Sequence, residues 1–140
     1  MNQINIPYRI HQIQTKQFAV FSENLNLSND NIEIQAGFGF GYSRELDSIR
    51  CTAKFDYVQD EKLVLTSEIQ CFFSISEEGR DVLLKNKIIP VDFLRYMATI
   101  ATGTARGIIH SKTEGTPVNY LVLPPINVTE NIDKDLKIEL

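Results

Sequence analysis

The sequence contains few of the residues from which catalytic and metal-binding centres are built. Among its 140 residues there are two cysteines, two histidines and no tryptophan. Cys51 and Cys71 are not part of a CxxC motif, and His11 and His110 lie far apart, so no metal-ligand spacing is present. No Ser/His/Asp or Cys/His arrangement for nucleophilic catalysis is discernible. We therefore expect a protein that is not an enzyme and that uses no metal or other cofactor.

Basic charge and long apolar runs are also scarce. The 14 basic and 18 acidic residues give a net charge of −4, which argues against a nucleic-acid binder with its usual basic stripe. Apolar runs are only a few residues long, so no membrane-spanning segment is expected. Residues 1–5 lack the basic start and apolar core of a signal peptide. These features predict a cytoplasmic protein with two free thiols rather than a disulfide.

What is present is the composition of one ordinary globular domain. The length predicts a single domain over residues 1–140, large enough to bury a substantial core. Alternation with a period of two predicts strands over residues 8–21, 32–42, 48–58 and 63–73. In the first strand, this alternation places Ile10, Gln12 and Gln14 on one face and residues 11, 13 and 15 on the other. Even-numbered residues from Ile32 to Tyr42, and odd-numbered residues from Ile49 to Tyr57, form one apolar face each.

Short polar connections join the predicted strands. Residues 28–31 form a turn cluster, and residues 59–62 form a hairpin loop, which together indicate an antiparallel meander. Cys51 and Cys71 fall in two strands that we expect to pair, so they are candidate neighbours. The acidic side chains around the hairpin are expected to form a solvated face rather than a catalytic pair; they are Asp56, Asp60, Glu61 and Glu68.

A long helix follows the strands. Pro90 and Asp92 suit the first turn of a helix, which we expect to continue to Ser111 or Lys112. Four antiparallel strands followed by one long helix define an α+β domain. Residues 76–89 fit either a short helix or an irregular segment. Residues 128–140 are equally open, because Ile132 and Leu136 are spaced as in a helix whereas residues 136, 138 and 140 alternate as in a strand.

Glycine alternates with aromatic residues from Gly37 to Gly41. A phosphate-binding loop would place its glycines in a turn before a helix, whereas these continue a strand pattern. The spacing leaves one strand face bare and puts Phe38, Phe40 and Tyr42 on the other. Two interpretations remain: an ordinary core face, or an aromatic row that lines an open groove for extended polypeptide.

The long helix is rich in small residues. Glycine in a helix interior costs about 1 kcal/mol relative to alanine, so Gly103 and Gly107 suggest that another backbone approaches closely. Phe93, Met97 and Ile100 already supply one apolar face for the domain's own sheet. We therefore expect the small-residue face to meet a partner chain, through Ala98, Ala101, Thr102, Gly103 and Ala105.

Three sequence blocks together resemble the SecB family of export chaperones. The first is Ile10-x-x-Ile13 followed by Thr15-Lys16, similar to the family's first strand. The second, residues 68–75, ends in an aromatic-Ser-Ile as the family's fourth strand does. The third combines a proline-led helix, an Arg-Gly at residues 106–107, and an arm with prolines at residues 117, 124 and 125. After this arm, the segment 128–140 is shorter than the second helix and polar tail of the family.

The resemblance implies a SecB-like fold, a dimer of dimers with the long helix between the dimers, and ATP-independent binding of unfolded polypeptide through a hydrophobic groove. It places groove residues on the second strand. The groove that we predict from the resemblance and from the apolar pattern comprises Ile34, Ala36, Phe38, Phe40, Phe72, Leu121, Leu123 and Ile126. An alternative within the family is a chaperone that serves one partner, as in toxin–antitoxin systems.

The resemblance also raises the question of the export motor SecA, which contacts an acidic patch on the outer sheet face of SecB proteins. At matching positions this chain has Gln17 and Phe21 where the family carries acidic side chains, and it retains Glu68. Exposed charge pairs contribute only about 0–1 kcal/mol each, so several must act together. We therefore expect a weak coupling to SecA, or none.

Overall fold

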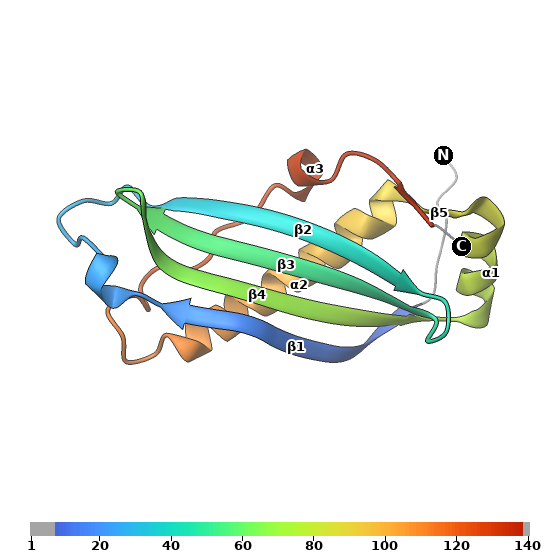
Figure 1. Ribbon diagram of the computed structural model, residues 1–140, viewed down its shortest axis with the longest axis horizontal. Helices are drawn as coiled ribbons and strands as arrows, with labels where there is room; N and C mark the ends of the chain where they lie inside the picture. The colour runs from blue at the N-terminus through green and yellow to red at the C-terminus, as the bar shows by residue number, and fades with distance from the viewer. Residues whose placement is uncertain (1–7, 139–140) are drawn as a thin grey trace.

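The computed structural model describes residues 8–138 and has two layers (Figure 1). A four-stranded antiparallel sheet forms one layer, and a long helix crosses one face of it diagonally. The elements are β1 (Tyr8–Val20), η1 (Ser22–Asn24), β2 (Glu33–Ser43), β3 (Ser48–Gln59), β4 (Lys62–Ile75), α1 (Glu77–Asn86), β5 (Ile88–Ile89), α2 (Val91–Lys112), α3 (Val128–Asn131) and β6 (Leu136–Lys137). The predicted α+β class and the predicted bounds of the sheet strands and the long helix are confirmed, the bounds to within two residues.

The strand order is β1-β4-β3-β2, so only β2, β3 and β4 form the predicted meander. β1 pairs with β4 instead of β2, and the loop after β1 crosses the end of the sheet. Polar side chains hold this loop in place. The buried Gln59 amide accepts a hydrogen bond from the Asn26 backbone N–H at 2.7 Å and donates to the carbonyl oxygens of Asn26 and Asn29. Local patterns could not predict a contact that joins residues so far apart in the chain.

β1 also differs from its predicted alternation. Its pairing with β4 shifts register between Ile10 and Gln12 and again between Thr15 and Gln17. Because each shift inserts a residue into the strand, Ile10 and Ile13 lie on the same sheet face, opposite Phe73 and Cys71. The strict period of two that we predicted for this strand is therefore wrong.

The core lies between α2 and the inner face of the sheet. The odd-numbered residues of β3 from Ile49 to Tyr57 are fully buried there, as predicted. Cys51 and Cys71 are paired across β3 and β4, and both thiols are free. Burial raises the pKa of the Cys51 thiol to about 12, so this thiol stays protonated at neutral pH.

The buried side of α2 differs from our prediction. Leu94, Met97 and Ile109 are buried on the sheet, and so are the small residues between them; these are Ala98, Ala101, Thr102 and Ala105. Small side chains let the helix axis approach β3 and β4 closely, which accounts for their burial. They therefore offer no surface to a partner, and the assignment of this face to an oligomer interface has to be corrected. Gly103 and Gly107 are exposed, and a Cβ atom at either would meet nothing within 4 Å.

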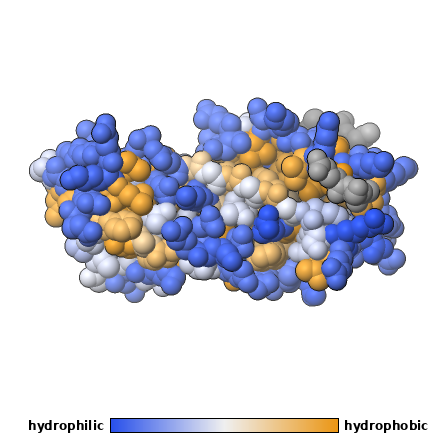
Figure 2. All heavy atoms as spheres, viewed as in Figure 1, coloured by the Kyte–Doolittle hydropathy of each residue, from blue (hydrophilic) through white to orange (hydrophobic). Residues whose placement is uncertain are grey.

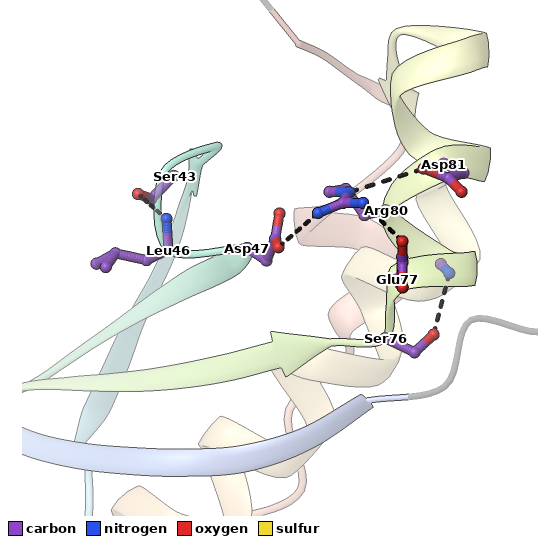
Figure 3. Close-up of polar contacts among 8 residues, drawn as sticks. Ser43, Leu46, Asp47, Ser76, Glu77, Arg80 and Asp81 are labelled. Carbon is purple, nitrogen blue, oxygen red and sulfur yellow. Dashed lines mark hydrogen bonds and ion pairs between the residues drawn. The ribbon is translucent and has the colours of Figure 1, made fainter.

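Residues 77–86, for which the sequence allowed two interpretations, form the helix α1. The Ser76 hydroxyl caps it by accepting a hydrogen bond from the Gly79 N–H at 3.0 Å. Arg80 then joins this helix to the β2–β3 turn through an ion pair with Asp47, at 3.0 Å between Nη1 and Oδ2 (Figure 3). Glu77 and Asp81 flank the same guanidinium, at 3.5 and 3.7 Å.

Candidate polypeptide-binding surface

The row of apolar residues in β2 lies on the side of the sheet that carries α2. Ile34, Ala36, Phe38 and Phe40 are all half-buried, and they pack against the core without being enclosed by it. Phe38 meets the buried Phe55 edge to face, with ring centroids 5.9 Å apart. The row therefore packs against the core on one side and is partly accessible on the other, and its use as a groove for polypeptide stays a prediction.

From Gly37 to Gly41, the opposite face of β2 carries no side chain. A Cβ atom at Gly37 or Gly39 would meet nothing within 4 Å, so no neighbouring group in the chain requires glycine there. Gly41 differs, because the Arg50 guanidinium lies where its side chain would be, 2.7 Å from the Cβ position. Figure 2 shows this outer sheet face as a mixture of hydrophilic, weakly hydrophobic and hydrophobic residues, with hydrophobic atoms towards both ends of the molecule.

The arm after α2, residues 113–127, returns along the helix behind the sheet (Figure 1). Arg106 holds it through two hydrogen bonds, from Nε to the Leu123 carbonyl at 2.6 Å and from Nη2 to the Pro124 carbonyl at 3.1 Å. Within the arm, the side chains of Val118 and Leu123 are buried in the core. Tyr120 and Val122 between them are 55% and 56% exposed, so the arm presents apolar surface to solvent.

A second arginine of α2 holds the chain beyond the arm. Arg95 lies eleven positions before Arg106, which is close to three helical turns, so both side chains emerge from the same side of the helix. Arg95 Nε donates to the Ile132 carbonyl at 2.8 Å. Asp135 Oδ1 then accepts a hydrogen bond from the Val91 N–H at 2.7 Å and so caps the start of α2. These contacts fix α3, which lies against β2 and α2.

In the C-terminal segment, the helical alternative based on Ile132 and Leu136 is wrong, because the chain is extended at Ile132 and the only helical turn described there precedes it. α3 is a short helix, capped by the Asn127 side chain, which accepts from the Thr129 N–H at 3.1 Å. The strand-like alternation is realised in β6, which pairs with β5. Residues 139–140 lie outside the described part of the chain.

The predicted groove residues do not all come together. Ile34, Ala36, Phe38 and Phe40 on β2, and Leu121 and Ile126 on the arm, are half-buried on the α2 side of the sheet. Leu123 is only 2% exposed because its side chain packs into the core, so it offers no surface to a bound polypeptide. Phe72 lies on the outer face beside His11, because its neighbours Cys71 and Phe73 point into the core. Its inclusion in the groove was wrong, and the alternation of β4 carried the signal that excludes it.

Two hollows border the sheet at other places. One, of about 850 Å³, lies beside the β3–β4 hairpin and the start of β2. There, Ile32, Val58 and Leu63 are flanked by the acidic Glu33, Asp60 and Glu61. The other, of about 520 Å³, lies between β1 and α2 and is lined by Thr15, Gly103 and Gly107 among others. Neither is lined by the aromatic row of β2. The candidate surface is therefore an open apolar band rather than one of these hollows.

Glu68, the predicted contact with the motor, lies on the outer face of the sheet between a basic and a neutral side chain. Glu68 is half-buried and lies between Lys54 of β3 and Gln17 of β1 in the strand register. Asp56, the next acidic position on this face, accepts a hydrogen bond from the Thr66 hydroxyl. An acidic side chain directly opposite a lysine contributes little net negative potential to a shared patch.

The described residues contain no group of three or more histidine, cysteine, aspartate or glutamate side chains that could hold a metal ion. In the same part of the chain, no helix has both the length and the apolar character needed to cross a membrane. These two findings apply to residues 8–138.

The chain matches no protein-family model and no curated protein. Its fold, however, is similar to that of a solved structure, the Rv1957 SecB-like chaperone of Mycobacterium tuberculosis in complex with a ChAD peptide from the Rv1956 HigA1 antitoxin. The TM-score is 0.53 at 11% sequence identity, and the match covers 85% of this chain and 90% of the other. The likeness establishes a shared fold class, an antiparallel four-stranded sheet followed by a long helix.

Proposed function

We propose that this protein is an ATP-independent chaperone that binds non-native polypeptide through an apolar surface formed by β2 and the arm. The observation that carries the proposal is the half-buried row Ile34–Phe40 beside the exposed apolar side chains of the arm. The fold supports it, because a protein of the same fold has been solved with a bound peptide.

The binding energy in this proposal is hydrophobic. Apolar client side chains leave water when they contact Phe38, Phe40 and Leu121, and each Å² of buried apolar surface contributes about 25 cal/mol. Such contacts require no sequence motif in the client. We further propose that the protein assembles as a homotetramer in the cytoplasm, because repeated weak sites hold one long client with avidity.

Suppression of aggregation tests the proposal. Several unrelated proteins, diluted from denaturant in the absence of ATP, should remain soluble when this protein is present at tetramer-equivalent concentration. Light scattering measures the effect, and an inert globular protein at equal mass is the control. If no client is protected, general chaperone activity is excluded.

A second candidate is a chaperone dedicated to one partner. The structurally similar SecB-like chaperone was solved with a peptide of an antitoxin. This observation supports a dedicated chaperone as well as it supports a general one. The aggregation assay distinguishes the two candidates. If the protein prevents aggregation of only one partner, whose gene lies near its own, the dedicated role is supported. Protection of many unrelated clients supports the general one.

Coupling to the export motor SecA is the remaining question, and we propose that it is weak or absent. Glu68 lies opposite Lys54 and beside Gln17, so one carboxylate must attract the motor where the SecB pattern provides several. Calorimetry with the basic zinc-binding segment of the cognate SecA is the test. Micromolar or tighter binding that Glu68→Lys abolishes would overturn this proposal and favour an export role.

A further inference from the structure

The outer face of the sheet carries a hollow that the proposed function does not use. The strand register aligns Glu33 of β2, Val58 of β3 and Leu63 of β4 in one row across the sheet. Residues that lie directly opposite one another in neighbouring strands point to the same face, and Glu33 shares its face with the glycines of β2 rather than with Phe38. Ile32 lies beside this row, and the hollow that these residues line measures about 850 Å³.

The floor of the hollow is apolar and only partly covered. Val58 and Leu63 are half-buried, although the core of the domain lies on the other face of the sheet. Within residues 8–138, α2 and the arm lie behind the sheet, so neither covers this face (Figure 1). Figure 2 shows hydrophobic atoms among hydrophilic ones at the end of the face where the β3–β4 hairpin lies. The hollow therefore offers apolar contact area to another molecule.

Three carboxylates surround this apolar floor. Glu33, Asp60 and Glu61 are exposed, and within the described residues none of them takes part in an ion pair. Lys62, the nearest basic residue in the sequence, does not line the hollow. Three negative charges around an apolar floor complement a ligand that carries positive charges on both sides of an apolar group.

Both walls of the hollow are held in place by the fold itself. On one side, the buried Gln59 fixes the loop before β2 through hydrogen bonds to backbone groups of Asn26 and Asn29, at 2.7–3.1 Å. On the other side, Asp60 and Glu61 form the two-residue β3–β4 turn, with φ of 52° and 62°. Such a turn favours glycine at its second position, so the glutamate is present there at a conformational cost. A preformed site loses less entropy when it binds a ligand.

We propose that this hollow is a docking site for a basic segment of a partner protein, which inserts one aliphatic or aromatic side chain between lysine or arginine residues. The inserted side chain contacts Val58 and Leu63, and its cationic neighbours approach the three carboxylates. Burial of this anchor supplies affinity, whereas the charges raise the association rate and select the partner. The inference goes beyond the proposed function, because the hollow and the aromatic row of β2 lie on opposite faces of the sheet and can be occupied together.

The hollow is also separate from the acidic patch that the resemblance to SecB would assign to the export motor. Gln17, Phe21 and Glu68 stand at the positions of that patch, and none of them lines the hollow. Glu68 lies within β4 opposite Lys54, whereas the hollow lies at the β3–β4 hairpin and the start of β2. The two surfaces can therefore be tested with different variants.

Calorimetry with a panel of designed peptides tests the inference on the full-length protein. Each peptide carries one leucine or phenylalanine between pairs of lysines at varied spacing, and is otherwise made of glycine and serine. We expect at least one of them to bind with micromolar affinity. Its affinity should fall at least about tenfold when the apolar residue is replaced by serine, and it should fall again at high salt, which screens the charges.

Variants of the hollow locate the bound peptide. Leu63→Ser should reduce the affinity at least about tenfold, which corresponds to about 1.4 kcal/mol, and should leave suppression of aggregation unchanged. Glu33→Lys combined with Glu61→Lys should have an effect of the same size, and both of these positions are exposed, so the fold is kept. Glu68→Lys, a charge reversal on the same face but outside the hollow, is the control and should leave peptide binding intact.

The outcomes separate this inference from the proposed function. Phe38→Ser combined with Phe40→Ser should weaken suppression of aggregation while the peptide still binds; loss of peptide binding in this variant would place the peptide on the aromatic row and overturn docking in the hollow. Binding that does not depend on the apolar residue of the peptide, or that Glu68→Lys abolishes, also overturns it, as does a panel in which no peptide binds. Self-association that Leu63→Ser abolishes would assign the hollow to a second copy of the chain instead.

Discussion

Arg106 and Leu123 are joined by a 2.6 Å hydrogen bond between the Arg106 Nε and the Leu123 carbonyl oxygen, which ties α2 to the arm. The same guanidinium reaches Pro124, so a single side chain holds two consecutive carbonyl groups. Leu123 is thereby pressed into the core while Val122 points outward. The contact holds the part of the arm that contains these buried and exposed apolar residues, and it therefore bears on the client binding that we propose.

Arg106→Lys should release the arm. A lysine ammonium cannot reproduce the planar fork that reaches both carbonyls, and hydrogen bonds to charged groups contribute about 1.5–3 kcal/mol each when they are lost from partly buried positions. We expect faster hydrogen exchange of the arm amides between residues 119 and 126, and a lower urea midpoint. Lys112→Met, at an exposed position on the same helix, is the control and should have little effect on the arm.

The exposed glycines of α2 provide a test of assembly. Gly103→Leu should leave the protomer folded, because a side chain there meets no atom of its own chain within 4 Å. If the helix packs against a second dimer, overpacking of about 1–3 kcal/mol at each symmetry-related site should produce dimers. Light scattering measures the mass. A native monomer, or a tetramer that persists in Gly103→Leu, contradicts packing of a second dimer on the exposed glycine face of α2.

Ala101→Leu is the matched comparison for this experiment. Ala101 is fully buried under the sheet, so the larger side chain should destabilise the protomer itself by about 1–3 kcal/mol. Chemical denaturation should therefore distinguish the two helix faces. Equal stability of the two variants would mean that the buried and exposed faces of α2 are assigned incorrectly.

The two sides of the sheet should differ in client binding. Phe38→Ser combined with Phe40→Ser should reduce suppression of aggregation strongly, because the row loses its apolar side chains. Phe72→Ser, on the outer face, should leave suppression unchanged and serves as the control for removal of a half-buried phenylalanine. A double variant that unfolds would assign the row to the core, and circular dichroism provides that check.

The buried thiol of Cys51 should make stability decline at alkaline pH. Burial raises its pKa from 9.0 to about 12 in the folded protein. Its contribution is therefore fully present below pH 9, where the thiol is protonated in both states, and is lost as the pH rises from 9 towards 12. Denaturation midpoints measured across this range should fall less steeply in Cys51→Ala. An equal slope in both proteins would contradict the assignment to this thiol.

Periodicity in the sequence determined much of the architecture. The alternation in residues 32–42 and 48–58 identified the strands and the faces that they bury, because side chains in a strand point to opposite sides by covalent geometry alone. Pro90 and the helical spacing after it located α2 for a similar reason. These features depend on residues that are close together in the chain.

The tertiary structure alone decided which elements meet. No local pattern places β1 beside β4, inserts its two register shifts, or turns Ala98 and Ala101 rather than Gly103 towards the sheet. The arm is likewise positioned by Arg95 and Arg106, whose carbonyl partners lie 37 and 17 residues away in sequence. Such contacts are chosen by the packing of the whole chain, in which burial of one helix face or strand edge depends on every other element that competes for it. The sequence thus determined the strands and the helix, and only their packing decided which apolar residues remained on the surface.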